Sequence, residues 1–153
     1  MEKPSNQNFE NHGSLVPGFH GFTFGILILN LLWSIYRVVH LWPAPSGFLR
    51  WDAVIHALLA VGLLLLFFYA RVFALTVQDR VIRLEMMLRM GGLLPADLKS
   101  RFDEFTIAQL VALRFASDAE LPVLARKVLD ERLTDRKAIK RMIKNWKPDF
   151  LRA

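Results

Sequence analysis

Two long apolar runs dominate the first half of the chain, and they predict two helices that cross a membrane. In residues 19–39 the only formally charged side chain is Arg37, and residues 53–70, AVIHALLAVGLLLLFFYA, carry none. A helix rises about 1.5 Å per residue, so about 20 such residues span the hydrocarbon core of a bilayer. Residues 63–68, LLLLFF, have no polar side to turn to water, which argues against a soluble pair of buried helices.

A short connection separates the two runs. Residues 41–51, LWPAPSGFLRW, contain Pro43, Pro45 and Gly47, which interrupt helices. A connection this short predicts two antiparallel neighbours, a helical hairpin. Trp42 and Trp51 lie at its two ends, and indole rings favour the level of the lipid headgroups.

The charges that flank the runs predict the side of the membrane on which each end lies. Arg71, Arg80, Arg83 and Arg89 follow the second run closely, whereas the connection itself contributes only Arg50. Basic residues next to membrane-spanning helices favour the cytoplasmic side. We therefore expect a multi-pass membrane protein with both termini in the cytoplasm.

The second helix is expected to extend well beyond the membrane. Nothing in residues 52–90 breaks a helix, and Gly91 and Gly92 then supply a stop. Such a helix would be about 58 Å long, whereas the hydrocarbon core is about 30 Å thick. Two i,i+4 ion pairs are expected on the cytoplasmic part. They join Asp79 to Arg83 and Glu85 to Arg89.

The cytoplasmic part of this helix has an apolar stripe that is a candidate oligomer seam. Its residues follow the 3-4-3-4 spacing of helices that pack in coiled coils. The pattern covers about two heptads, fewer than the three or four that make such a prediction firm. Packing on the chain's own C-terminal helices explains the stripe equally well. The stripe consists of Ala74, Val77, Val81, Leu84 and Leu88.

After the two glycines, residues 93–153 contain four short helical signals and predict a compact helical subdomain. The helices are expected at residues 95–102, 107–115, 121–133 and 135–146. A unit of about 60 residues is small for independent stability, so we expect it to lean on the long helix or on the bilayer surface. The N-terminal signals are Pro95 at an N1 position, Thr106 with Gln109, Ser117 with Glu120, and Thr134.

The last predicted helix is basic and amphipathic. Ile139, Met142, Ile143 and Trp146 fall on one face. Next to a bilayer such a helix suits anionic lipid, at about 1 kcal/mol for each cation near the surface; nucleic-acid phosphates are a weaker fit. An ordinary helix docked by its apolar face explains the pattern equally well. The candidate lipid or partner surface consists of Arg136, Lys137, Lys140, Arg141, Lys144, Trp146 and Lys147.

Two polar side chains lie in the middle of the first apolar run. Asn30 and Ser34 are four residues apart, so they share one face of the helix. Polar groups in hydrocarbon seek partners on neighbouring helices. We therefore interpret this pair as a candidate contact between helices within the membrane.

Histidines and one carboxylate lie near the ends of the predicted spans. His40, Asp52 and His56 fall near the outer ends, and imidazole and carboxylate groups bind protons and divalent metals. His12 and His20 are a similar pair on the inner side. Each group has few ligands, and ordinary interfacial hydrogen bonds explain these histidines as well. A small redox or transport component is the hypothesis that they would support.

The composition excludes several classes of protein. The chain has 153 residues, about one domain, and its 54% apolar residues exclude an intrinsically disordered protein. The absence of cysteine excludes disulfide frameworks, thiolate metal sites and thiol nucleophiles. Residues 19–75 hold four charged side chains, whereas residues 76–153 hold 16 basic and 11 acidic ones. No phosphate-binding loop, dinucleotide-binding or hydrolase motif occurs, so we expect no enzyme activity and no cofactor.

Several stretches resemble an uncharacterised bacterial family of small two-span membrane proteins. They are QNFENHGSLVPGFH near the start, TVQDRVIRLE in the long helix, and LRFASDAELPVLARKVLDERL and IKNWKPDF near the end. The segments ASDAELP (residues 116–122) and NWKPD (residues 145–149) are the most distinctive. The resemblance implies a bacterial inner-membrane protein whose specific role lies in its cytoplasmic unit, and it carries over no functional residues.

The expected molecule is an all-α membrane protein without enzyme activity. We expect it to self-associate, or to serve as an accessory or scaffold subunit of a membrane complex, through its cytoplasmic helices. Its expected partners are membrane lipids and a second copy or another membrane protein. The alternative is a membrane-tethered adaptor that binds anionic lipid or nucleic acid through its basic C-terminal helix. The expected parts are a tail (1–18), a first membrane helix (19–40), an outer loop (41–51), a second membrane helix with its extension (52–90) and a cytoplasmic subdomain (93–153).

Overall fold

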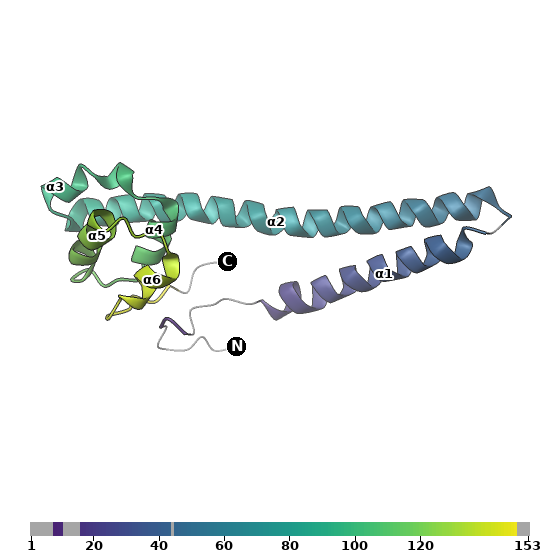
Figure 1. The fold of residues 1–153 in the computed structure, drawn as a ribbon, viewed down its shortest axis with the longest axis horizontal. Helices are drawn as coiled ribbons and strands as arrows, with labels where there is room; N and C mark the ends of the chain where they lie inside the picture. The colour runs from purple at the N-terminus through teal and green to yellow at the C-terminus, as the bar shows by residue number, and fades with distance from the viewer. Residues whose placement is uncertain (1–7, 11–15, 44, 150–153) are drawn as a thin grey trace. The chain divides into compact units, whose positions relative to one another are not determined.

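The computed structural model describes residues 8–10, 16–43 and 45–149 (Figure 1). Within these residues the chain forms helices and turns only, apart from one isolated bridge between Ala116 and Trp146, so the all-α prediction is confirmed. The residues form two compact units, one in Leu15–Ala74 and one in Leu75–Ala153 together with Met1–Ser14. The elements are η1 (Gly18–Thr23), α1 (Phe24–Leu41), α2 (Gly47–Leu93), α3 (Ala96–Lys99), η2 (Phe102–Glu104), α4 (Ile107–Leu113), α5 (Leu121–Asp130) and α6 (Arg136–Arg141).

The first unit is a hairpin made of η1, α1 and the first half of α2. Phe19 stacks on Phe67 with ring centroids 4.2 Å apart, and near the other end Arg37 pairs with Asp52. These two contacts make the helices antiparallel neighbours, as the short connection predicts. Gly18–Leu41 and Gly47–Leu93 are both long and apolar enough to cross a membrane.

The hairpin unit buries very few of its own side chains. Among its described residues the buried ones are Ser34, Ala53 and Ala60, all of them small. Small side chains let two helix backbones approach closely. None of the large apolar side chains described in this unit is buried; many are exposed and the others are half-buried, so the unit has no hydrophobic core of its own.

Helix α2 is longer than the predicted residues 52–90, and both differences have a local cause. It begins at Gly47, because no proline follows Pro45 to interrupt it. It runs through Gly91 and Gly92 without a positive φ angle and ends at Leu93. The stop is therefore Pro95, because a proline disfavours helical geometry in the residue before it.

Gly92→Ala tests this correction. The residue is exposed within α2, and a Cβ atom added there meets nothing within 4 Å. We expect the substitution to stabilise the chain by about 0.4–1 kcal/mol, because alanine loses less backbone entropy than glycine on folding. Thermal unfolding of the full chain in detergent measures the change. A lower melting temperature would mean that Gly92 needs a left-handed conformation and terminates the helix.

The second unit has a core that joins the C-terminal helices to α2. Ile82, Met86 and Met90, which follow one another at four-residue steps, turn one face of α2 into it. This packing is the support that so small a subdomain needs. The C-terminal part of the core consists mainly of Leu98, Phe105, Leu110, Leu113, Phe115, Leu121, Ala125, Val128, Ile139 and Ile143.

The helix starts in this unit confirm one predicted capping box, show half of a second and correct the third predicted cap. The Thr106 side chain accepts from the Gln109 amide, and the Gln109 side chain accepts from Thr106, so the predicted capping box is present. Before α5, which begins at Leu121, the Ser117 hydroxyl accepts from the Glu120 amide at 3.4 Å as predicted, whereas the Glu120 carboxylate accepts from the amides of residues 144 and 145. Helix α6 is capped by Asp135, whose two carboxylate oxygens are better acceptors for two amides than the hydroxyl of the predicted cap Thr134.

All four predicted helices of this unit are shorter in the structure: α4 ends at Leu113 rather than at residue 115, and α5 ends at Asp130 rather than at residue 133. Residues 95–102 break into α3 and η2 rather than forming one helix. The basic helix predicted over residues 135–146 ends at Arg141. Beyond it the backbone turns to pair with the end of α4: Ser117 N–H donates to Asn145 O, and Lys147 N–H donates to Phe115 O. These longer-range bonds replace the last turns of the predicted helix.

The two ion pairs predicted within α2 are also replaced. Arg83 pairs with Asp103 instead of Asp79, and Arg89 pairs with Asp118 instead of Glu85. An i,i+4 pair on a helix surface contributes only about 0.2–0.5 kcal/mol. The subdomain that packs on the same helix brings other carboxylates within reach of both arginines. Both arginines pair with these carboxylates instead of with the local ones.

Candidate functional site

The predicted oligomer seam lies on the side of α2 that faces away from the C-terminal helices. Val77, Val81, Leu84 and Leu88 are 61%, 48%, 54% and 68% exposed. At 3.6 residues per turn they lie roughly 180° around α2 from the face that packs into the core. Among the described residues, a different face of α2 therefore carries the subdomain. Ala74, the fifth predicted residue, is also exposed and belongs to the hairpin unit.

Arg89 connects α2 to the loop between α4 and α5. Its Nε donates to Asp118 Oδ1 at 2.8 Å, and its Nη1 donates to the carbonyl of Arg114 at 3.0 Å. Its Nη2 donates to the carbonyl of Ala116. The side chain is only 15% exposed. One arginine thus satisfies two main-chain carbonyls and a carboxylate where the chain leaves α4.

The two most distinctive sequence segments, ASDAELP and NWKPD, form one junction beside Arg89. Besides the main-chain bonds that join residues 115–117 to residues 145–147, the carboxylate of Glu120 accepts from the amides of Lys144 and Asn145, at 2.9 and 3.1 Å. Arg114 adds an ion pair with Asp149 at 3.1 Å. These polar residues therefore hold the C-terminal segment onto α4 and α5.

A cleft of about 260 Å³ lies next to this junction. The basic side chains in its wall already have carboxylate partners: Arg89 and Lys147 approach Asp118, and Arg114 pairs with Asp149. The cleft therefore has the charge balance of a structural junction rather than that of an anion site. It is lined by Glu85, Met86, Arg89, Arg114, Lys147, Pro148 and Asp149.

The residues of the predicted lipid or partner surface do not share one face. Lys140 is buried with its ammonium group 4.9 Å from the ring centre of Phe115, and Trp146 packs on the same ring. Arg141 lies over the ring of Phe9, at 5.3 Å from its centre. The remaining members, Arg136, Lys137, Lys144 and Lys147, are exposed.

In the hairpin unit the predicted contact pair is divided between two environments. Ser34 is buried, whereas Asn30 is exposed although it lies one turn away. Ser34 thus lies on the side of α1 that is covered within the unit. Asn30 lies on a side that the described part of the chain leaves open.

The histidine and carboxylate group near the connection between α1 and α2 is held by ordinary contacts. Asp52 accepts from Arg37 at 2.7 Å, and His56 Nδ1 lies 2.8 Å from the carbonyl oxygen of Asp52. His40 stacks on Tyr36 instead. Among the described residues, no three potential metal ligands of these types come together. Of the second predicted pair, His20 contacts the backbone of Val16, and His12 lies outside the described residues.

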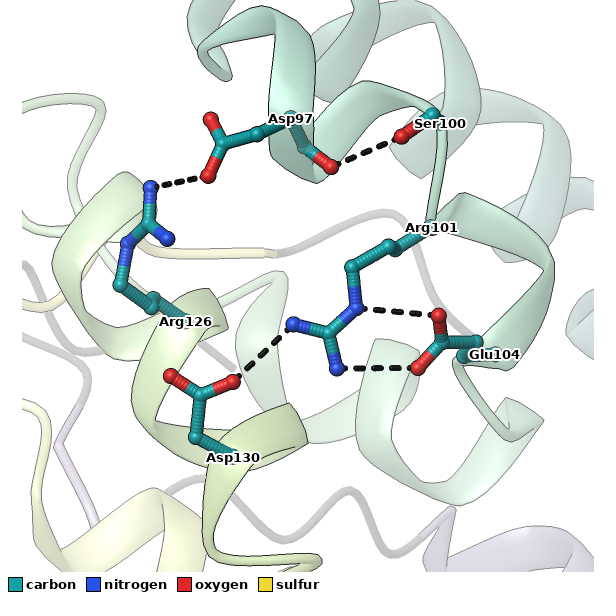
Figure 2. Close-up of polar contacts among 6 residues, drawn as sticks. All are labelled: Asp97, Ser100, Arg101, Glu104, Arg126 and Asp130. Carbon is teal, nitrogen blue, oxygen red and sulfur yellow. Dashed lines mark hydrogen bonds and ion pairs between the residues drawn. The ribbon is translucent and has the colours of Figure 1, made fainter.

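Two arginines that the sequence analysis did not single out connect α3 and η2 to α5 (Figure 2). Arg101 holds Glu104 with two hydrogen bonds of 2.9 and 3.0 Å and reaches Asp130 with a third. Arg126 of α5 pairs with Asp97 of α3 at 2.7 Å. No local spacing connects residues 29 positions apart, so only the folded chain reveals these partners.

These hydrogen bonds shift the pKa of three carboxyl groups. The bond from Arg126 lowers the pKa of Asp97, that from Arg101 lowers the pKa of Glu104, and that from Arg89 lowers the pKa of Asp118. In each case the arginine stabilises the charged form of its partner. The carboxylates are therefore part of what keeps the subdomain folded.

We expect acid to destabilise the subdomain for this reason. A lowered pKa stabilises the fold above the ordinary values, 3.8 for the aspartates and 4.5 for Glu104, and the stabilisation is lost as the pH falls through the lowered values. Denaturant unfolding at several pH values should show a plateau above about pH 5 and a decline below it. Arg101→Met should make the decline shallower. A stability that does not change between about pH 5 and pH 3 would contradict the assignment.

Comparison with known proteins supports one family assignment. The sequence profile of a family of unknown function (DUF6526) matches residues 1–153. This match confirms the resemblance to an uncharacterised family. No curated protein and no solved structure matches the chain.

Proposed function

We propose that this chain, which belongs to the family of unknown function DUF6526, is a non-enzymatic integral protein of the bacterial inner membrane. In this proposal it self-associates, or serves as an accessory or scaffold subunit of a membrane complex, through its cytoplasmic helices. The hairpin anchors it, both termini lie in the cytoplasm, and the second unit presents the docking surface.

The exposure of the hairpin supports the membrane anchor. Large apolar side chains such as Leu29, Leu58 and Phe68 are more than half exposed on helices long enough to cross a bilayer. Exposed apolar area of this extent is rare on soluble monomers, and hydrocarbon is the solvent that accepts it. The few buried residues of the unit are small, as at interfaces between membrane helices.

The observation that carries the docking role is the stripe on α2. Its four side chains Val77, Val81, Leu84 and Leu88 stay exposed even though a folded subdomain packs on the same helix. An apolar stripe that the described chain itself does not cover is typical of a surface that another helix binds. The alternative, an adaptor that uses its basic C-terminal residues, is less well supported because α6 is only six residues long and Lys140 points inward.

Extraction and cross-linking of the full chain from its native membranes test the proposal. We expect the chain to stay in the membrane pellet after a high-salt wash and to need detergent for release. Amine cross-linking before extraction should then trap it as an oligomer or with a constant partner. Tags on the two termini should label from the cytoplasmic side only. Release by salt alone, or a monomer under every condition, would contradict the proposal.

A further inference from the structure

The exposed stripe on α2 has charged neighbours that limit what can cover it. At 3.6 residues per turn, Arg80 and Glu85 lie roughly 70° to either side of its centre, one on each flank. Charged side chains at the same level make hydrocarbon an unfavourable environment for this part of the helix. The chain's own C-terminal helices pack on the opposite face. The stripe therefore fits a protein partner with an apolar face and charges at its edges.

A second copy of the same helix meets both requirements when it lies parallel to the first. Val77, Val81, Leu84 and Leu88 then occupy the a and d positions of two heptads, with Arg80 at g and Glu85 at the following e position. In a parallel pair, each g side chain lies beside the e side chain of the next heptad on the other helix. Arg80 of each copy thus lies beside Glu85 of the other.

The opposite orientation lacks this complementarity. In an antiparallel pair, g positions face g positions and e positions face e positions, so Arg80 and Glu85 do not meet. Neither residue has an ion-pair partner among the described residues, whereas nearby Arg83 and Arg89 are both engaged by the subdomain. The free arginine and the free glutamate are thus the two residues that a parallel pair of helices brings together.

We propose that two copies of this chain associate in parallel through the Val77–Leu88 stripe, with Arg80 of each copy paired to Glu85 of the other. This inference rests on the proposed function, since it names the partner of the same surface. Two heptads are too short for a stable coiled coil in free solution. Two helices anchored side by side in one membrane meet at a high effective concentration, so a short seam suffices there.

Disulfide trapping in membranes tests the seam directly, because the natural chain has no cysteine. Leu84→Cys, at a central d position, should form a disulfide-linked dimer under mild oxidation. Val123→Cys is the matched control, since Val123 is 74% exposed in the same unit but lies on α5. We expect the dimer yield of Leu84→Cys to exceed that of the control by about tenfold. The two d-position cysteines would be held in contact by the seam, whereas the control cysteines would meet only by random collision. Equal yields would overturn the proposal.

Charge reversal in the Leu84→Cys chain tests orientation and register. Arg80→Glu alone places carboxylates opposite carboxylates, and Glu85→Arg alone places cations opposite cations. Each should lower the dimer yield by about fivefold, because like charges at these edge positions repel. The two changes together restore opposite charges and should restore the yield. A double variant that dimerises as poorly as the single ones would overturn the parallel pairing.

Mixing the two single variants separates this inference from the proposed function. Co-expressed Arg80→Glu and Glu85→Arg chains with different tags should form mixed dimers in preference to dimers of either variant. If the dimer yield of the Leu84→Cys chain is unchanged by every charge reversal, the pairing of Arg80 with Glu85 is refuted, but self-association is not. A complex of the full chain with another protein, without a dimer at Leu84→Cys, would refute the second copy but leave the scaffold role intact.

Discussion

Phe115→Ala is expected to destabilise the C-terminal subdomain by about 3–5 kcal/mol, the usual cost of deleting a buried phenylalanine ring. Phe115 is fully buried. Its ring lies 4.9 Å from the ring of Trp146, 4.9 Å from the ammonium group of Lys140 and 4.7 Å from the guanidinium carbon of Arg114. Removing the ring therefore leaves a cavity and takes away the surface against which these three buried or half-buried side chains lie.

A loss of this size is a large part of the stability of a small unit. Single domains are stable by only about 5–15 kcal/mol in total. We expect the variant to lose helical signal at a lower temperature in detergent and to be cleaved rapidly by protease after residue 93, while the hairpin unit remains intact. Val123→Ala, which removes an exposed side chain, is the control. Equal protease resistance of the Phe115→Ala chain and the natural chain would mean that the core does not depend on this ring.

Arg89→Met is expected to cost about 2–4 kcal/mol, because hydrogen bonds to charged groups and buried unpaired carbonyls carry the largest polar penalties. Methionine keeps the apolar stem of the side chain but donates no hydrogen bond. The carbonyls of Arg114 and Ala116 then lose their donor, and Asp118 loses its main cation. The connection between α2 and the junction of the two distinctive segments should weaken.

Arg83→Met is the matched control for this prediction. Arg83 lies on the same helix and has an ion pair too, but its partner Asp103 is 92% exposed. Exposed pairs contribute little to stability, so this variant should unfold close to the natural chain. Denaturant unfolding of both variants, followed by fluorescence of Trp146 and the other tryptophans, makes the comparison. Equal destabilisation by the two substitutions would contradict the special role of Arg89.

Local pattern alone was sufficient for several features of this protein. The uninterrupted apolar runs predict the two long helices, because a helix that is apolar on all sides is recognisable from consecutive residues. The capping box at Thr106 and Gln109 was equally readable, since its partners are three residues apart. The exclusion of thiol chemistry needed only the absence of cysteine.

Other features depended on competition that no local pattern contains. Arg83 and Arg89 had carboxylates four residues away, yet both bind carboxylates of the packed subdomain. The basic segment after Arg141 has a helical pattern, yet its backbone pairs with residues 115–117. In both cases packing brings a partner that is distant in the sequence close in space. The interaction with that partner is more stabilising than the weak local interaction that it replaces.

The sequence by itself determined that this is an all-helical chain with two long apolar helices and a charged C-terminal half. It also determined that the second helix has an amphipathic extension that leads into that half. Only the tertiary structure decided which face of that extension is used within the chain. Ile82, Met86 and Met90 enter the core, and the Val77–Leu88 stripe stays exposed. Both faces are apolar at helical spacing, so periodicity ranks them equally. The choice follows from which face the short C-terminal helices can reach and fill, and that depends on contacts between residues far apart in the chain.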